Sequence, residues 1–161
     1  CAALAHRGWR LLSDEFGLLC PGSTAFVPLP RPMPIKNESI AVLRAFAPDA
    51  EWGPTIPGTI KGTVAHLCPP VSSVAQAAIR APAAWVVFPR WAAGASLSLQ
   101  PVDRPEAFMS LATNAFNYEI HGEAGFDTLR SLVETTRCFR LSYSDLSGAL
   151  AAIDALADGA R

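Results

Sequence analysis

The sequence has no run of about 18 apolar residues, which is the minimum that a transmembrane helix needs. It also has no block of like charge: 13 basic residues stand against 14 acidic ones, and the net charge is −1. Nucleic acids and anionic membranes attract strongly basic surfaces, so this balance gives no electrostatic reason to expect either as a partner. Single basic groups that bind a phosphate remain compatible with it.

Cysteine is scarce and scattered. The four cysteines, Cys1, Cys20, Cys68 and Cys138, are far apart and form no CxxC pair. This spacing differs from that of zinc sites and from the dense disulfide framework of small secreted domains. We therefore interpret the cysteines as reduced thiols of the core of a cytoplasmic protein.

Hydrophobic residues, in contrast, are plentiful. They make up 50% of the 161 residues, which suits one globular domain with a sizeable core. Strand-like and helix-like segments alternate along the chain, a pattern typical of an α/β fold. Because we find no internal repeat and no domain boundary, we predict a single domain over residues 1–161.

Apolar or alternating runs bounded by glycine or proline predict the strands. The expected strands are 9–13, one or two short ones within 16–29, 63–67, 85–88, 96–102 and 138–141. Residues 85–88 are apolar throughout, which favours a central, buried strand. The proline-dense segment 28–34 cannot be a helix or an interior strand, so we expect an extended surface loop there that ends at residues 36–38. Residues 49–61, rich in glycine and proline, predict another loop.

Apolar residues that recur every three or four positions predict the helices. The expected helices are the last turns of one that begins upstream and closes at Gly8, then 39–47, 74–81, one that follows Asp103, one around 126–133 and one through 156. Asp103 and Glu106 resemble a capping box with Pro105 in the first turn. Phe116 is expected on the inner face of that helix, and Ser144 as the cap of the last one.

One short segment combines structural signals and acidic residues in an order that is known from a protein family. Residues 8–15 read Gly-Trp-Arg-Leu-Leu-Ser-Asp-Glu: a helix-ending glycine, a short apolar run and two acidic residues. This order resembles the region that follows the P-loop helix in the HPr serine kinase/phosphorylase family. Lys61 before the strand-like run 62–67, and Arg104 before a late helix, stand where that family also carries basic residues.

Three further segments, 28–32, 36–39 and 88–91, resemble the HPr-related kinase A branch of the family, so the resemblance covers nearly the whole chain. Two features depart from the family. No GxxxxGK[ST] phosphate loop occurs, so we expect a catalytic domain cut just after its P-loop and inactive without it. Lys61 stands where HPr kinases have arginine.

The resemblance implies a fold and an activity. The fold would be a P-loop kinase-like sheet, of the type shared by HPr kinase and PEP carboxykinase, with flanking helices and an incomplete N-terminus. The activity would be transfer of phosphate from ATP, with Mg²⁺, to a hydroxyl group. A serine of a small phosphocarrier-like protein is the acceptor that the family suggests, and its hexamers suggest a homo-oligomer.

Phosphoryl transfer requires cations around the phosphates, a magnesium ion, and a carboxylate that orients or deprotonates the acceptor hydroxyl. The resemblance assigns that carboxylate to Asp14, which would also bind Mg²⁺ together with Glu15. Lys61 and Arg104 would neutralise charge in the transition state.

Arg31, Lys36 and Asn37 are the candidate ligands for the nucleotide, because they lie on the proline-stiffened segment just before a predicted helix. Simpler roles stay open for each position. Asn37 would serve as an N-cap, Lys36 as a surface charge, and Asp14 as part of a solvated turn. His66, on the strand that follows Lys61, is a weaker candidate.

Two other functions also stay open. One is a small-molecule kinase with the same nucleotide chemistry. The other is a module that binds nucleotide or a partner protein and catalyses nothing. The upstream sequence discriminates between enzyme and binding module, because only an intact GxxxxGK[ST] loop supports catalysis.

Overall fold

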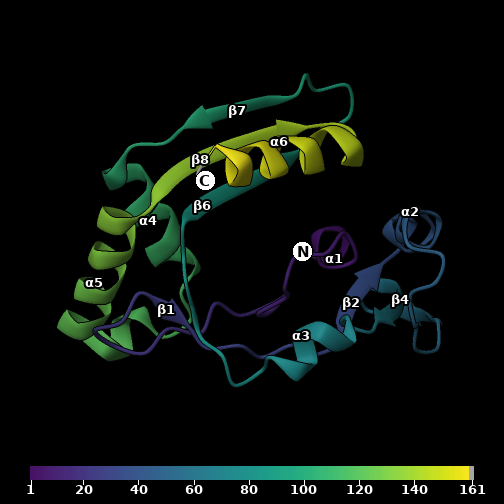
Figure 1. Ribbon diagram of the computed structural model, residues 1–161, viewed down its shortest axis with the longest axis horizontal. Coiled ribbons are helices and arrows are strands. Elements are labelled where there is room, and N and C mark those ends of the chain that lie inside the picture. The colour runs from purple at the N-terminus through teal and green to yellow at the C-terminus, as the bar shows by residue number, and fades with distance from the viewer. Residues whose placement is uncertain (160–161) are drawn as a thin grey trace. The chain divides into compact units, whose positions relative to one another are not determined.

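A computed structural model describes residues 1–159 of the chain. Its elements, labelled in Figure 1 where there is room, are α1 (Ala2–Ala5), β1 (Ala25–Phe26), β2 (Met33–Lys36), α2 (Glu38–Phe46), β3 (Ile56–Thr59), β4 (Gly62–Leu67), α3 (Val71–Ala75), β5 (Ala81–Pro82), β6 (Trp85–Trp91), β7 (Ser98–Pro101), α4 (Arg104–Asn114), α5 (Tyr118–Thr135), β8 (Arg137–Tyr143) and α6 (Leu146–Asp158). The predicted α/β class is confirmed: the structure combines small sheets with helices. Within the part described, no helix combines the length and apolarity needed to cross a membrane.

The described residues form two compact units. The first contains residues 1–18 and 26–81, and the second contains residues 19–25 and those from 82 onward. Each unit has its own three-stranded sheet, and the short strands β1 and β5 pair with each other.

The sheet of the first unit has the strand order β2–β4–β3 and is antiparallel. Side chains alternate between its two faces, as the period of a strand requires. One face is buried, and the opposite face is the more exposed one. The buried side chains are Met33, Ile35, Ala65 and Leu67, and the cross-strand pairs on the other face are Pro34 with His66 and Lys36 with Val64.

The segment around this sheet shows two departures from the expected loops. Residues 33–36, expected as loop, form β2, and Pro34 is tolerated because β2 lies at the edge of its sheet. Residues 56–59 form the opposite edge strand within the second expected loop. The predicted helix and strand at 39–47 and 63–67 are confirmed as α2 and β4.

The predicted strand at 9–13 is wrong, since none of these residues belongs to a strand. Leu11 is nevertheless buried, and its backbone N–H donates to the buried hydroxyl of Ser73 at 3.0 Å. One side chain therefore replaces a sheet ladder as the partner of this backbone group. Leu12 accepts a second backbone bond, from the N–H of Leu29 at 2.6 Å.

In the second unit the strand order is β6–β8–β7, with β6 parallel and β7 antiparallel to the central β8. The run 85–88 is a strand, as predicted, but it lies at an edge and is only half-buried. Among these three strands burial is highest on β8, where Leu141 is 1% exposed. The prediction of core thiols holds only for Cys138, because Cys1 is exposed and the other two cysteines are half-buried; all four are free.

Helix α4 begins as predicted at Asp103, whose carboxylate accepts the Glu106 N–H at 2.8 Å. The Glu106 side chain forms an ion pair with Arg140. Helix α6 is capped by Asp145, not by Ser144, because the Asp145 side chain accepts a backbone N–H of the first turn. Phe116 was expected inside and is 86% exposed.

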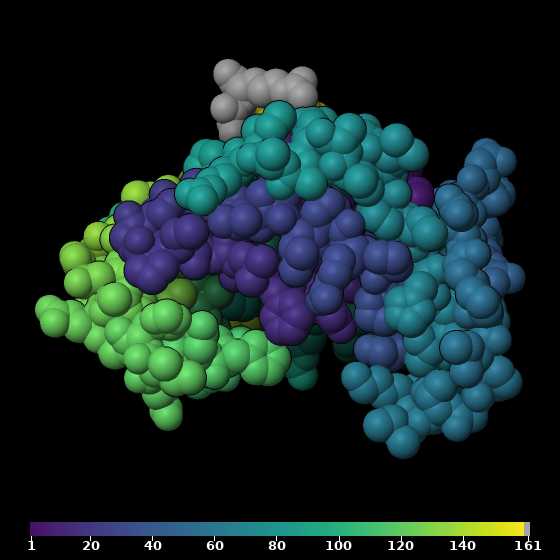
Figure 2. All heavy atoms as spheres, turned by 90° about the horizontal axis from the view of Figure 1, so that it is seen from below, coloured from purple at the N-terminus to yellow at the C-terminus, as the bar shows by residue number. Residues whose placement is uncertain are grey.

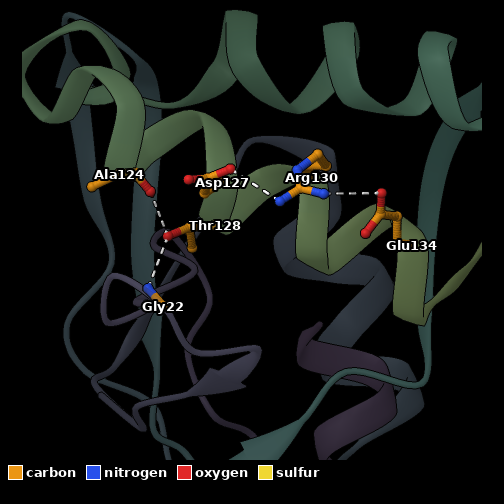
Figure 3. A network of polar contacts seen from close by, with 6 residues as sticks. All are labelled: Gly22, Ala124, Asp127, Thr128, Arg130 and Glu134. Atoms are coloured by element: carbon orange, nitrogen blue, oxygen red, sulfur yellow. Dashed lines mark hydrogen bonds and ion pairs between the residues drawn. The ribbon is translucent and has the colours of Figure 1, made fainter.

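Helix α5 breaks at Gly122, where φ is 50°, so it consists of one short and one longer helical piece. The longer piece carries the network of Figure 3. Thr128 accepts the Gly22 N–H at 3.2 Å and donates to the Ala124 carbonyl at 2.7 Å. This buried hydroxyl thereby ties residues 19–25 to α5.

Candidate functional site

A cleft of about 590 Å³ opens on the first unit, over the exposed face of the β2–β4 pair. Alternation along the two strands brings four side chains to its floor, while their neighbours in sequence point into the core. The remaining lining residues come from the N-terminal segment, the proline-rich segment and the β3–β4 turn. The cleft is lined by Ser13, Asp14, Glu15, Leu29, Arg31, Pro32, Pro34, Lys36, Lys61, Val64 and His66.

The two acidic residues lie in the N-terminal segment. The Ser13 hydroxyl accepts the Phe16 N–H at 3.3 Å, which closes a turn around Asp14 and Glu15. Within residues 1–159, the Asp14 carboxylate accepts no hydrogen bond and forms no salt bridge. Burial lowers the pKa of the Cys1 amine, although Cys1 as a whole is exposed, and the Asp14 charge opposes that lowering.

Glu15 faces a cation across the cleft: its carboxylate lies 3.7 Å from the Arg31 guanidinium. Both side chains are about half exposed, at 51% and 58%. A pair this open to water contributes little stability and is easily exchanged for another partner. Arg31 is therefore available to an anionic ligand at small cost.

Lys36 and Lys61 are the only lysines of the chain, and both line this cleft. Lys61 sits on the turn between β3 and β4. The colour bar of Figure 2 identifies the blue part of the surface as the segment of the chain that contains these two strands. The Thr59 hydroxyl orders this turn, since it accepts the Lys61 N–H at 3.1 Å and donates to the Gly62 carbonyl at 2.7 Å. Neither lysine forms an ion pair within the part of the chain that the structure describes.

Asn37 does not line the cleft, although it follows Lys36 directly. It occupies the N-cap position of α2, but its side chain makes no capping bond. The side-chain amide instead reaches the β3–β4 turn, where it accepts the Thr63 N–H at 3.0 Å and donates to the Lys61 carbonyl at 3.5 Å.

Arg104 belongs to the second unit. Its guanidinium donates to the Glu134 carbonyl at 3.3 Å, and it lines a separate cleft of about 370 Å³ together with Arg137. Its assignment to catalysis stays a prediction.

Asp14 and Glu15 are compatible with a bound magnesium ion. Over residues 1–159 no cluster of three or more His, Cys, Asp or Glu side chains forms. Magnesium does not require one, because it keeps several waters and commonly binds one or two carboxylates together with substrate phosphates. Asp14 and Glu15 fit such a site, because the same cleft is lined by three cationic side chains that can bind the phosphates.

Sequence reasoning missed part of the lining. Ser13, Pro34 and Val64 were not singled out, and His66 was only a weak candidate. The signal was present for two of them: Val64 and His66 are two residues apart on a predicted strand, so they share a face. Which face lines the cleft depends on β2, which was expected to be a loop.

No family model, no curated protein and no solved structure matches this chain. The residues of the cleft are therefore the structural basis for a functional proposal.

Proposed function

We propose that the chain supplies the phosphate-binding and acceptor-activating cleft of an ATP-dependent phosphotransferase of the HPr serine kinase type. The proposal includes a P-loop kinase-like fold for the complete domain, and a hydroxyl acceptor, with a protein serine as the preferred one. One observation carries it. Asp14, Glu15, Arg31, Lys36 and Lys61, from separate segments of the chain, line one cleft.

The charges in the cleft suit the proposed chemistry. Three cationic side chains provide charge-assisted hydrogen bonds to phosphate oxygens, and lysine and arginine are the residues that bind such groups. Arg31 exchanges its exposed ion pair with Glu15 for the ligand. Lys36 and Lys61 have no ion pair to give up among residues 1–159. The cleft therefore offers a binding site for a polyanion, and the Asp14 and Glu15 carboxylates lie beside that site.

Asp14 then takes the acceptor proton. Its carboxylate lines the cleft without a hydrogen-bonding partner in the described residues, so it is available to a hydroxyl group. Within hydrogen-bond reach, it would orient that hydroxyl and accept its proton as the hydroxyl oxygen bonds to the γ-phosphorus of ATP, while the bond from that phosphorus to the bridging oxygen breaks and ADP leaves. Mg²⁺ and ATP, when bound, supply charge neutralisation and the transferred phosphoryl group, and Glu15 and Asp14 are the residues that would hold the metal.

A non-catalytic binding module is the second candidate. The observation in its favour is that Arg31, Lys36 and Lys61 line one cleft, because three cationic side chains bind a phosphate without the help of a catalytic carboxylate. Such a module would use the same three cations to hold a nucleotide or an acidic partner, but it would not need Asp14.

Calorimetry with Mg-ATP tests the proposal on the chain and on the chain extended upstream to include the P-loop that the proposal requires. We expect binding by the extended chain, weakened about tenfold or more by Lys61→Met because one charge-assisted contact is lost. Asp14→Asn should remove the dependence of binding on Mg²⁺ and abolish transfer to an acceptor. Asp49→Asn, an exposed carboxylate outside this cleft, is the matched control. No binding by either protein would reject the nucleotide proposal.

Lysine chemistry gives a second readout for the same proposal. Because the chain has only Lys36 and Lys61, acetylation followed by mass spectrometry reports on this cleft alone among side-chain amines. Mg-ATP should slow modification of both lysines together. Binding without protection of either lysine would place the nucleotide elsewhere.

A further inference from the structure

We infer that Asn37 is the positioning residue of this cleft: its side-chain amide joins β2 to the β3–β4 turn and thereby holds Lys61 over the anion site. The inference rests on the proposed function and adds a residue that does not itself touch the ligand.

The backbone of Asn37 is the first observation. Its φ of 49° makes it the one non-glycine residue with positive φ in residues 1–159, and its ψ of −129° lies outside the left-handed helical region. L-residues avoid this conformation, and it persists only where surrounding contacts hold it. Such strained residues are concentrated at functional sites.

The contacts that hold Asn37 all lead to one turn. Its backbone N–H donates to the Thr63 carbonyl at 2.9 Å, and its side-chain oxygen accepts the Thr63 N–H at 3.0 Å. Its side-chain nitrogen donates to the Lys61 carbonyl at 3.5 Å. A single residue thus bonds to both sides of Gly62 and fixes the backbone that carries the Lys61 side chain.

Gly62 is shaped to receive this amide. A Cβ atom at Gly62 would lie 2.2 Å from the Asn37 side-chain oxygen, so only glycine leaves room for it. The φ of 84° at Gly62 is also a glycine conformation. Asn37 is thus linked to both lysines of the cleft. Lys36 is its neighbour in sequence, and the Lys61 carbonyl accepts a hydrogen bond from its side chain.

Asn37→Gly is the informative variant. Glycine adopts a positive φ without cost, so the fold is retained while the amide is lost. Affinity for inorganic pyrophosphate is measured by calorimetry in the wild-type, Lys61→Met and Arg31→Met backgrounds, each with and without Asn37→Gly. If Asn37 acts through Lys61, Asn37→Gly weakens pyrophosphate binding about fivefold or more in the wild-type and Arg31→Met proteins. In the Lys61→Met protein the same change weakens it less than about twofold, because the side chain that Asn37 positions is already missing.

Arg31 is the matched control, because it lines the same cleft without a bond to Asn37. An equal loss of affinity in the Lys61→Met background, or no loss in the wild type, overturns the inference and leaves the proposed function intact. If neither the wild-type chain nor the chain extended upstream binds pyrophosphate, both the inference and the proposed function are overturned. Deuterium exchange of the Thr63 amide, measured without ligand, verifies that Asn37→Gly has released the turn; an unchanged exchange rate also counts against the inference.

Discussion

At the scale of single residues, side chains satisfy several backbone hydrogen-bonding groups that are satisfied by other backbone groups in regular secondary structure. The Ser73 hydroxyl serves the Leu11 N–H, the Thr59 hydroxyl orders the β3–β4 turn, and the Asn37 amide bonds to that turn. Across the described residues, no buried side-chain nitrogen or oxygen lacks a partner. Buried polar groups are costly when unsatisfied, so these contacts determine the paths of segments that have no sheet ladder.

Two glycines of the β3–β4 hairpin distinguish the energetic cost of a left-handed backbone from the cost of a steric clash. Gly58 and Gly62 both have positive φ, at 71° and 84°, but only at Gly62 would a Cβ meet another atom. Gly58→Ala should cost about 1–2 kcal/mol of unfolding free energy, from the left-handed backbone alone. Gly62→Ala should cost at least about 1 kcal/mol more, because it also displaces the Asn37 amide. Urea denaturation of the two variants measures the difference, and equal costs would contradict the contact.

At the scale of elements, the segment at 9–13 shows how an apolar pattern can mislead. Its residues have the composition of a buried strand, and Leu11 is indeed buried. No neighbouring strand pairs with it, since the Leu11 N–H is satisfied by Ser73. Composition reports burial, whereas membership of a sheet requires a partner strand.

Ser73→Ala tests this account. The substitution leaves the buried Leu11 N–H without an acceptor, which should lower the unfolding free energy by about 1–3 kcal/mol. Ser72→Ala is the matched control, because Ser72 is exposed and adjacent in the same helix. Denaturation curves compare the two, and a cost at Ser73 no larger than that at Ser72 would show that the bond is dispensable.

At the scale of the whole molecule, the residues divide between two units, and so do the predicted site residues. Asp14, Glu15, Arg31, Lys36 and Lys61 belong to the first unit. The predicted catalytic arginine at position 104 belongs to the second. The single-domain prediction and the role of that arginine stay predictions.

Hydrogen exchange with and without inorganic pyrophosphate tests this division. We expect protection of amides in the Ser13–Glu15 segment, β2 and β4, because these segments line the cleft. Strands β6 to β8 should exchange at unchanged rates. Protection at Arg104 as well would support its predicted part in the site, whereas protection confined to the second unit would contradict the proposed cleft.

The sequence by itself determined part of the local structure and proposed the candidate site residues. Helix α2 and strands β4 and β8 were predicted to within two residues, because amphipathic periodicity and proline boundaries are local properties. The acidic pair and the basic residues were also proposed from the sequence, through a family resemblance, and their roles stay predictions. The predictions of helices and strands required only the chemistry of neighbouring residues.

Only the tertiary structure decided which segments meet. It placed β6 at an edge, made an edge strand from the proline-rich residues 33–36, and left 9–13 without a strand. It also brought Asp14, Lys36 and Lys61 to one cleft and turned Asn37 away from it. Strand order and clefts arise from contacts between residues far apart in the chain, and the periodicity of a segment does not encode its distant partner.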